Sequence, residues 1–309
     1  MELTPELEHH SVEVDGRRVT YTAHGPQDAP AVYVGVHGLM GGGDSFWPVI
    51  AGVPSHWRVV LPDLPGCGGS EVMLPPHRHT VDGYARWLHT FLADTGLADR
   101  KVVLASIATG AAIAIRYARY HQERVLGQVM HLPFLGKAAI GKKWLRPVVA
   151  YALWVPPLRA LVDRLRAIDA LMHRIILHEP PDAIPELAER DIRHKQHADL
   201  NAAGQLLHSL MLTDSVAEMA SLRQPTLILA SEHDFTAPLR LLERVVRNRP
   251  ERRLYVHRGG QHSWNEPFIE QMNKEIRAFL TGLAPILPEP VPDSSAKSRG
   301  PVPAPAGEE

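Results

Sequence analysis

Apolar and amphipathic segments alternate along most of the chain. Five short runs are apolar without strict alternation, which is typical of strands buried on both faces of a parallel sheet. These runs cover residues 31–36, 57–61, 101–105, 125–132 and 225–230. Helical periodicity covers residues 81–92, 108–120, 239–247 and 268–280. The alternation of strands and helices predicts an α/β fold with a doubly wound, mostly parallel sheet.

Three regions depart from this rhythm. Strand-like segments at 12–14 and 19–21 flank Asp15-Gly16, a dipeptide that favours a type I′ turn, so we expect an antiparallel hairpin there. Residues 133–223 contain helical patterns and no convincing strand, which predicts a helical cap over the edge of the sheet. Residues 284–309 are rich in proline and lack aromatic residues, which predicts a disordered tail. The core is expected to span 1–132 and 224–283.

The composition narrows the class of protein. Hydrophobic residues make up 45% of the 309 residues, which is enough for a sizeable core and excludes global disorder. A formal charge of −1 gives no reason to expect a nucleic-acid partner. Cys67 is the single cysteine, so no intramolecular disulfide is expected. The acidic start and the lack of a membrane-spanning apolar run predict a soluble, cytoplasmic protein that acts on a small molecule.

Two glycine-rich turns follow the first two apolar runs. In His37-Gly38-Leu39-Met40-Gly41, glycine allows backbone N–H groups to approach a ligand closely. No Gly-Lys-Ser/Thr follows, which argues against a phosphate loop. Asp63, in the second turn, is expected to stabilise that turn rather than to act as a catalytic acid. Nothing near Cys67 in the sequence indicates an activated thiolate.

The segment Ser106-Ile107-Ala108-Thr109-Gly110 joins a predicted strand to a predicted helix, where a nucleophile elbow would lie. An elbow requires small residues two positions before and two positions after its centre. A centre at Ser106 would have the bulky Leu104 as a flank, and a centre at Ile107 would be inert. A centre at Ala108 has Ser106 and Gly110 as flanks, which is the best steric fit. The N-terminus of the following helix would then point at the reacting centre.

A candidate acid and a candidate base follow later in the chain. Glu232 and Asp234 come at the carboxyl end of the strand at 225–230, where open α/β sheets collect their functional groups. Asp234 is preferred as the acid because of its spacing from the strand. His262 lies on a loop between a short strand at 253–256 and the final helix, which makes it the candidate base.

Together these motifs resemble the α/β-hydrolase family with a helical cap, over roughly residues 10–282 and in the chain order nucleophile, acid, histidine. Segments 110–118 and 123–125 are also similar to the family's helix and strand after the nucleophile, and counting back from them reaches residue 108. The resemblance implies that Asp234 and His262 are the acid and the base. It further implies an oxyanion hole made by the N–H groups of Leu39 and Thr109, and no cofactor. Ala108 departs from the family pattern, which has Ser, or less often Asp or Cys.

A methyl group at position 108 cannot attack a carbonyl, so covalent turnover is expected to be lost or nearly lost. Three interpretations stay open. The chain is a variant of a serine hydrolase that holds its substrate intact, a non-catalytic receptor or carrier of a small apolar molecule, or an enzyme in which His262 and Asp234 act as a general base. In the first interpretation, the bond that the serine hydrolase cleaves is an ester, a related acyl bond or a carbon–carbon bond. Epoxide and haloalkane opening are disfavoured, because enzymes of those kinds carry Asp at the nucleophile position.

Specificity is expected to reside in the predicted cap and the first glycine-rich turn, with Met40, Trp144 and Trp154 contacting the substrate. The cap combines apolar side chains with eight basic residues between 137 and 174, opposed by two acidic residues. This mixture fits a lipid-like or anionic acyl substrate or a membrane surface, although an ordinary amphipathic helix is the preferred interpretation. Residues that recur at intervals of three are interpreted as a solvated helix face rather than a metal site: Asp191, His194 and His197.

Overall fold

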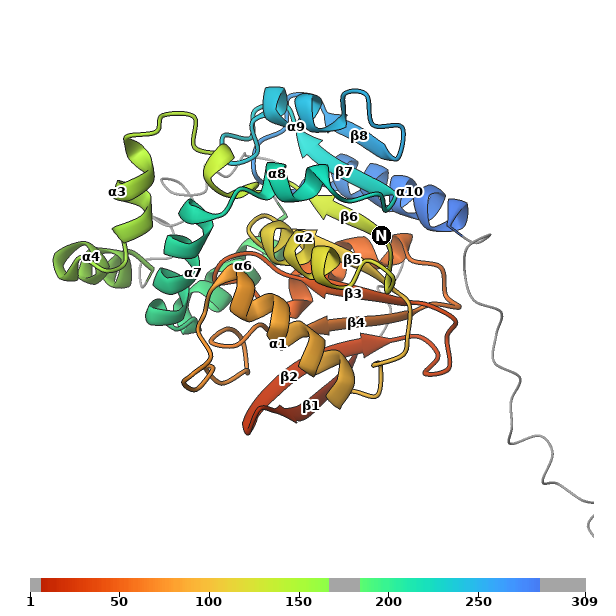
Figure 1. Cartoon of the computed structure of the whole chain (residues 1–309), viewed down its shortest axis with the longest axis horizontal. Helices are drawn as coiled ribbons and strands as arrows, with labels where there is room; N and C mark the ends of the chain where they lie inside the picture. Colours follow the sequence, from red (N-terminus) through yellow and green to blue (C-terminus); the bar gives the residue numbers. More distant parts are fainter. Residues whose placement is uncertain (1–6, 167–183, 284–309) are drawn as a thin grey trace, which may run out of the picture.

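The computed structural model describes residues 7–166 and 184–283, which form one eight-stranded sheet with helices on both faces (Figure 1). The strand order is β1-β2-β4-β3-β5-β6-β7-β8. The strands are β1 (Glu8–Val14), β2 (Arg17–His24), β3 (Val32–Val36), β4 (Arg58–Pro62), β5 (Val102–Ile107), β6 (Val125–His131), β7 (Thr226–Ser231) and β8 (Arg252–His257). The 3₁₀ and α-helices are η1 (Gly43–Gly52), α1 (Val81–Asp94), α2 (Gly110–Tyr120), η2 (Gly136–Ala138), α3 (Leu145–Tyr151), α4 (Pro156–Arg166), α6 (Pro185–His197), α7 (Leu200–Leu212), α8 (Ser215–Ala220), α9 (Leu239–Val246) and α10 (Glu266–Gly282).

The predicted doubly wound, mostly parallel sheet is confirmed. Strands β4, β3, β5, β6, β7 and β8 pair in parallel, whereas β1 and β2 pair antiparallel with each other and β2 pairs antiparallel with β4. The turn between β1 and β2 has positive φ at Asp15 (50°) and Gly16 (71°), as a type I′ turn requires. The predicted hairpin is therefore present.

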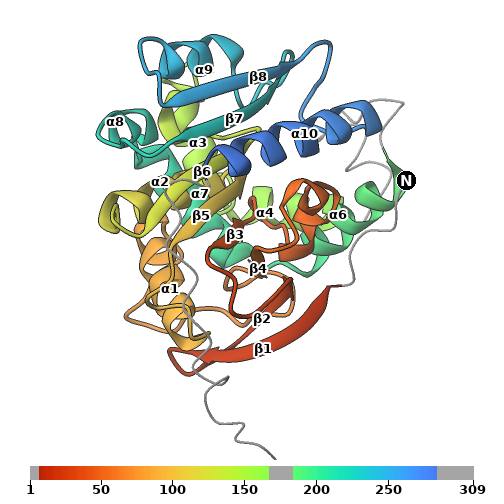
Figure 2. The same cartoon turned by 90° about the vertical axis from the view of Figure 1, so that its right-hand side faces the viewer.

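Successive residues of the central strands belong to two different apolar cores. Along β3, Val32, Val34 and Val36 belong to the core that includes side chains of α1, α2 and α9, whereas Tyr33 belongs to the core that includes η1 and α10. Because side chains alternate across a strand, each short apolar run supplies both cores at once. Figure 2 shows α10 and η1 on the opposite side of the sheet from α1 and α2.

The described part of the segment 133–223 consists of helices and connecting turns, with no strand. Helix α7 lies along α3, and α3 and α4 stand at the outer edge of the molecule (Figure 1). The predicted tail, 284–309, lies outside the described residues. No helix in the described ranges combines the length and the apolar character needed to cross a bilayer.

Candidate active site

The turn between β5 and α2 holds Ala108 in the left-handed region, with φ at 46°. The Ala108 N–H donates to the His131 carbonyl at 3.0 Å, and the Ala108 carbonyl accepts from Phe134 N–H at 2.9 Å. A β-carbon added to Gly110 would overlap the Val36 and His37 carbonyl groups, so the chain needs glycine there to turn into α2. This strand, turn and helix have the sharp geometry of a nucleophile elbow, with Ala108 at its tip.

The left-handed backbone at Ala108 yields a stability prediction. A residue with a β-carbon costs on the order of 1 kcal/mol in this conformation, whereas glycine is unstrained. Ala108→Gly is therefore expected to raise the free energy of unfolding by about 1 kcal/mol, measured by urea denaturation. The matched control is Ala114→Gly inside α2, which is expected to lower the same free energy by about 1 kcal/mol. Destabilisation by both variants would contradict a strained backbone at Ala108.

Half-buried His262 and buried Asp234 form a pair at the carboxyl ends of β8 and β7. The Nδ1–H of His262 donates to Asp234 Oδ2 at 2.7 Å, which leaves Nε2 with its lone pair. Asp234 Oδ1 accepts from the N–H and O–H of Thr236, both at 2.7 Å, and from Ala237 N–H at 3.1 Å. Burial acts to raise the pKa of Asp234, but the hydrogen bonds from His262 and Thr236 and the charge of His262 hold that pKa below its ordinary value. The carboxylate is thus fixed and ionised behind the imidazole.

Glu232, the other candidate acid, does not contact His262. Glu232 accepts from Arg258 at 3.1 Å and from the Gly259 N–H at 3.0 Å, on the surface. Asp234 is the carboxylate that contacts His262. Asp234 therefore remains the preferred candidate for the acid.

The first glycine-rich turn is held by His37, which is fully buried. His37 Nε2 accepts from Leu64 N–H and His37 Nδ1 donates to the Gly38 carbonyl, both at 2.8 Å. The Gly38 carbonyl also accepts from Gly41 N–H at 3.1 Å. Burial lowers the pKa of His37, which keeps the ring neutral and able to accept. The glycine-rich turn is therefore rigid where it passes the elbow.

The directions of the Leu39 and Thr109 N–H groups are set by hydrogen bonds to the carbonyl of the same peptide unit. The N–H and C=O of a trans peptide point in opposite directions, so fixing the Gly38 carbonyl aims the Leu39 N–H away from His37. In the same way, the bond from Phe134 to the Ala108 carbonyl fixes the Thr109 N–H. Neither N–H donates to another group of the described chain. A β-carbon built on Gly38 would lie 3.4 Å from the Ala108 methyl group, so the two turns are in contact.

A cavity of about 370 Å³ lies over these groups, and Ala108 and His262 both line it. Its wall is mainly apolar and includes Leu39, Ile107, Leu132, Leu187, Phe235 and Trp264. Charged side chains of α6 form one part of the wall: Arg190, Asp191 and Lys195. A cavity of this size and lining fits a small, largely apolar molecule.

Helix α6 is anchored over the cavity by Asp44 of η1. The Asp44 carboxylate accepts from His194 Nε2 at 2.5 Å and from Arg190 at 3.3 Å, and Arg190 lies 5.0 Å above the Trp47 ring. The interpretation of 191, 194 and 197 as a solvated helix face is wrong for His194, which is 14% exposed and packs on Gly42. Asp191 pairs with Lys195, and His197 bonds to the Arg193 carbonyl within the helix. No cluster suited to a metal ion exists in the described ranges.

The anchor yields a second prediction. Asp44→Asn removes the negative charge that Arg190 and His194 face, and a partly buried pair of this kind contributes about 1–2 kcal/mol. Amide exchange along Pro185–His197 is therefore expected to accelerate about tenfold, measured by mass spectrometry. The control is Asp28→Asn, at an exposed aspartate away from α6. Unchanged exchange in α6 would mean that apolar contacts alone hold the helix.

The second glycine-rich turn has a structural role. Asp63 accepts from Gly43 N–H at 2.8 Å, from Gly69 N–H at 3.1 Å and from Thr20 Oγ1 at 2.7 Å. These bonds tie the turn to β2 and η1, so the expectation that Asp63 stabilises its turn is confirmed. Burial raises the pKa of the Cys67 thiol to about 12, which excludes a thiolate nucleophile there.

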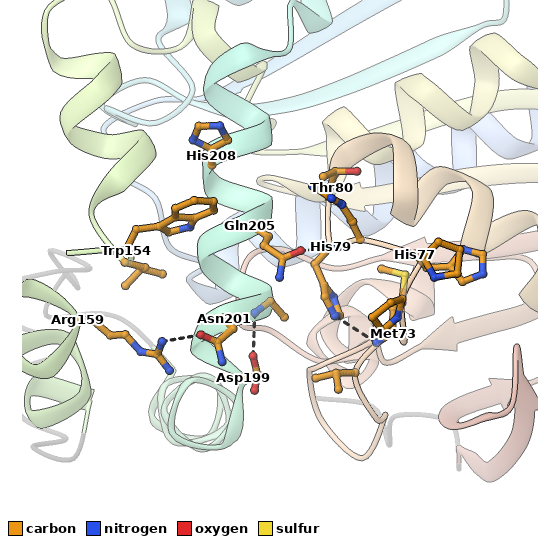
Figure 3. Close-up of a pocket in the computed structure, with 16 residues that line it drawn as sticks. Met73, His77, His79, Thr80, Trp154, Arg159, Asp199, Asn201, Gln205 and His208 are labelled. Carbon is orange, nitrogen blue, oxygen red and sulfur yellow. Dashed lines mark hydrogen bonds between the residues drawn. The ribbon is translucent and has the colours of Figure 1, made fainter. Parts of the chain in front are cut away.

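A larger cavity, of about 920 Å³, lies elsewhere, between α7, α4 and the loop 72–80 (Figure 3). Several of its polar groups are hydrogen-bonded to the scaffold, whereas Nδ1 of His208 has no partner among the described residues. His79 Nε2 accepts from Met73 N–H at 3.2 Å, and Arg159 donates to Asn201 at 2.5 Å. Asp199 caps α7 by accepting from Ala202 N–H. Neither Ala108 nor His262 lines this cavity.

The predicted site residues fall into two groups. Ala108, Leu39 and His262 line the smaller cavity, with Asp234 directly behind His262 and Thr109 next to Ala108. The three predicted substrate contacts lie outside its lining: Met40 is buried against Leu153, Trp144 is 67% exposed on α3, and Trp154 borders the larger cavity. The sequence analysis missed Asp44, Arg190, Lys195, Phe235 and Trp264. Only Phe235 and Trp264 could have been found from the sequence. Phe235 directly follows Asp234, and Trp264 lies two residues after His262.

The eight-stranded, mostly parallel sheet with helices on both faces is the architecture of an α/β hydrolase. A family model described as the alpha/beta hydrolase fold matches residues 34–266. The chain belongs to this family.

Solved structures share the fold at low sequence identity. They include a thermophilic esterase from Thermogutta terrifontis with malate bound, which is 20% identical at a TM-score of 0.66 and covers 91% of this chain and 100% of its own. An enol-lactonase from Burkholderia xenovorans is 18% identical at a TM-score of 0.70, covering 88% of this chain and 100% of its own. A bromoperoxidase from Bacillus anthracis is 18% identical at a TM-score of 0.70, covering 89% of this chain and 100% of its own. Since these proteins carry three different activities in their names, the likeness defines the fold and not the reaction.

Proposed function

We propose that the chain is a capped α/β hydrolase of the Ser-Asp-His type in which Ala108 occupies the nucleophile position. The observation that carries the proposal is a strained residue at the tip of the elbow, lining the same cavity as a histidine that is hydrogen-bonded to a buried carboxylate. Asp234 orients His262, whose Nε2 is the base. The N–H groups of Leu39 and Thr109 form the oxyanion hole.

The alanine removes one step and leaves the others. Acyl transfer requires an oxygen that gives its proton to His262 and bonds to the carbonyl carbon. Without that oxygen no acyl-enzyme forms, and in serine hydrolases this loss costs about a millionfold in turnover. The hole still binds a carbonyl oxygen and the apolar wall still binds the acyl group, so the substrate stays bound and intact.

The substrate class follows from the cavity. We propose an ester or a related acyl compound, small and mainly apolar, enclosed by the helical segment 133–223 acting as a cap. The 370 Å³ volume and the apolar lining support this size and character. The esterase and the enol-lactonase among the structural relatives act, by their names, on bonds of this class.

Binding without cleavage tests the proposal. Short-chain aryl esters are expected to change the fluorescence of the chain saturably, because Trp264 lines the cavity, and to be recovered uncleaved. Ala188→Trp, which fills the cavity from α6, is expected to abolish the change. Ala160→Trp, on the exposed side of α4, is the control and retains it. An ester that binds equally to both variants would place binding elsewhere.

A second candidate function is general-base catalysis without a covalent intermediate. The hydrogen bond from Nδ1 to Asp234 leaves His262 Nε2 able to accept a proton from water or from a bound substrate. Under this function the unaltered chain turns over an activated ester slowly, and His262→Ala reduces that rate to the uncatalysed level. Binding with no turnover would instead favour a receptor or carrier.

A further inference from the structure

Exposed apolar side chains concentrate on α3, α4 and their connection. Eleven large apolar residues are strongly exposed in the described ranges, and seven of them lie between residues 144 and 161. The seven are Trp144, Val148, Tyr151, Trp154, Val155, Leu158 and Leu161, with exposed fractions from 36% to 67%. The other four are scattered: Leu74, Tyr120, Leu212 and Phe235. Scattered residues are normal on a protein surface, but a cluster of this extent marks a contact site.

We call this exposed surface of α3, α4 and their connection the outer face; at its inner edge Tyr151 and Trp154 also contact the His208 ring of α7. Trp144, Val148 and Tyr151 are spaced at i, i+4 and i+7, which places them on one side of α3. The opposite side of the same stretch is buried through Ala150 and Leu153, where α3 packs on α7. Leu158 and Leu161 are exposed one turn apart on α4. Figure 1 shows α3 and α4 at the edge of the molecule, with α7 on their inner side.

The charge around the outer face has a single dominant sign. Between residues 141 and 164, five basic side chains stand against one acidic one, Asp163. The basic residues are Lys142, Lys143, Arg146, Arg159 and Arg164. The whole chain is nearly balanced, with 33 basic and 34 acidic residues, so the excess is local. Lys142 and Lys143 are exposed and form no ion pair with any described residue.

We propose that the outer face docks on the surface of an anionic lipid bilayer. Tryptophan, tyrosine and leucine beside lysine and arginine are the combination that interfacial helices use, with aromatic rings at the headgroup level and cations on lipid phosphates. The positive charge of the outer face favours an anionic membrane over a second copy of the chain. Two copies meeting through this face would bring the same positive residues together, which is repulsive. An anionic membrane complements them.

Docking of the full chain on vesicles tests the proposal. Flotation is measured with vesicles of phosphatidylcholine alone and of phosphatidylcholine mixed with phosphatidylglycerol. Binding is expected only to the mixed vesicles and is expected to weaken as salt rises. Brominated lipid is expected to quench tryptophan fluorescence, because Trp144, the most exposed of the seven residues, enters the interface.

Two pairs of variants separate the contributions of charge and apolar contact. Lys142→Glu with Lys143→Glu is expected to weaken vesicle binding by at least about twentyfold, since each lysine contributes on the order of fivefold near an anionic surface. The control, Arg240→Glu with Arg244→Glu on α9, makes the same change in net charge at exposed positions and retains binding. Val148→Ser with Leu161→Ser is expected to reduce binding and bromine quenching, whereas Leu212→Ser, at an exposed leucine outside the outer face, retains both.

Three results would overturn the proposal. The first is no difference between the two kinds of vesicle. The second is vesicle binding that the outer-face variants leave unchanged, which would place the contact elsewhere. The third is a dimer, seen by analytical ultracentrifugation, that dissociates on Val148→Ser with Leu161→Ser, which would make the outer face an interface between copies.

Discussion

Ala108→Ser is expected to raise the rate constant for ester hydrolysis, kcat/KM, by at least about a thousandfold. In the proposed function the elbow, the His262–Asp234 pair and the two N–H donors are the remaining catalytic groups, so one oxygen completes the set. A seryl hydroxyl at the tip of the elbow enters the cavity that His262 lines. The gain is measured with p-nitrophenyl acetate and butyrate, and a fluorophosphonate is expected to label the variant at position 108.

Two control variants make this result specific. Ala188→Ser adds a hydroxyl to the wall of the same cavity but away from the elbow, and it is expected to remain at the level of the unaltered chain. The double variant Ala108→Ser with His262→Ala is expected to fall back to about the level of the unaltered chain, because the two side chains act as one unit. If Ala108→Ser hydrolyses no ester while the unaltered chain binds one, the cavity belongs to a receptor.

The sharp turn at Ala108 could be predicted from the sequence because its constraint is local. A left-handed residue between a strand and a helix collides with any bulky side chain two positions away, and only the centre at Ala108 avoids this. The close approach of Gly110 to β3 is the physical reason for that glycine. The strands were predictable for a similar reason, since a strand buried on both faces admits few polar residues.

The wall of the cavity could not be predicted, because it depends on contacts distant in sequence. Asp44 and Arg190 are 146 positions apart, and nothing in either neighbourhood indicates the other. The helix η1 contains Pro48 and has no long amphipathic period, so it gave no helical signal. Trp144 and Trp154 were expected at the substrate from their type alone, whereas the packing of α3 on α7 determines which way they face.

His131 is a buried histidine that destabilises the folded state at every pH. It ends β6 directly behind the elbow, and its ring lies 6.0 Å from Phe46 and 5.7 Å from Trp264. Neither ring nitrogen has a hydrogen-bond partner among the described residues. Burial lowers the pKa of His131 to about 3, against about 6.5 in an unfolded chain. Between those values the unfolded chain binds a proton that the folded chain does not.

The protein should therefore lose stability as the pH falls below about 6.5, by up to about 1.4 kcal/mol per pH unit from this histidine alone. His131→Leu replaces the ring with an apolar side chain of similar size. Its free energy of unfolding is expected to exceed that of the unaltered chain by about 1–2 kcal/mol at pH 7, because two unpaired polar atoms leave the core. The difference is expected to grow steadily between pH 6 and pH 4.5, measured by urea denaturation.

Other titrating groups act equally on both proteins, so the difference between the two free energies isolates His131. Asp234, whose pKa is held low in the folded state, also loses its contribution as acid is added, but it does so in both. His56→Leu, at an exposed histidine, controls for the loss of an imidazole from the unfolded chain. A difference that stays constant from pH 7 to pH 4.5 would mean that His131 gains a proton, or a partner, without unfolding. Water from the cavity would then reach the His131 ring past Trp264 in the folded protein. The packing behind the elbow would be mobile and hydrated rather than rigid and free of water.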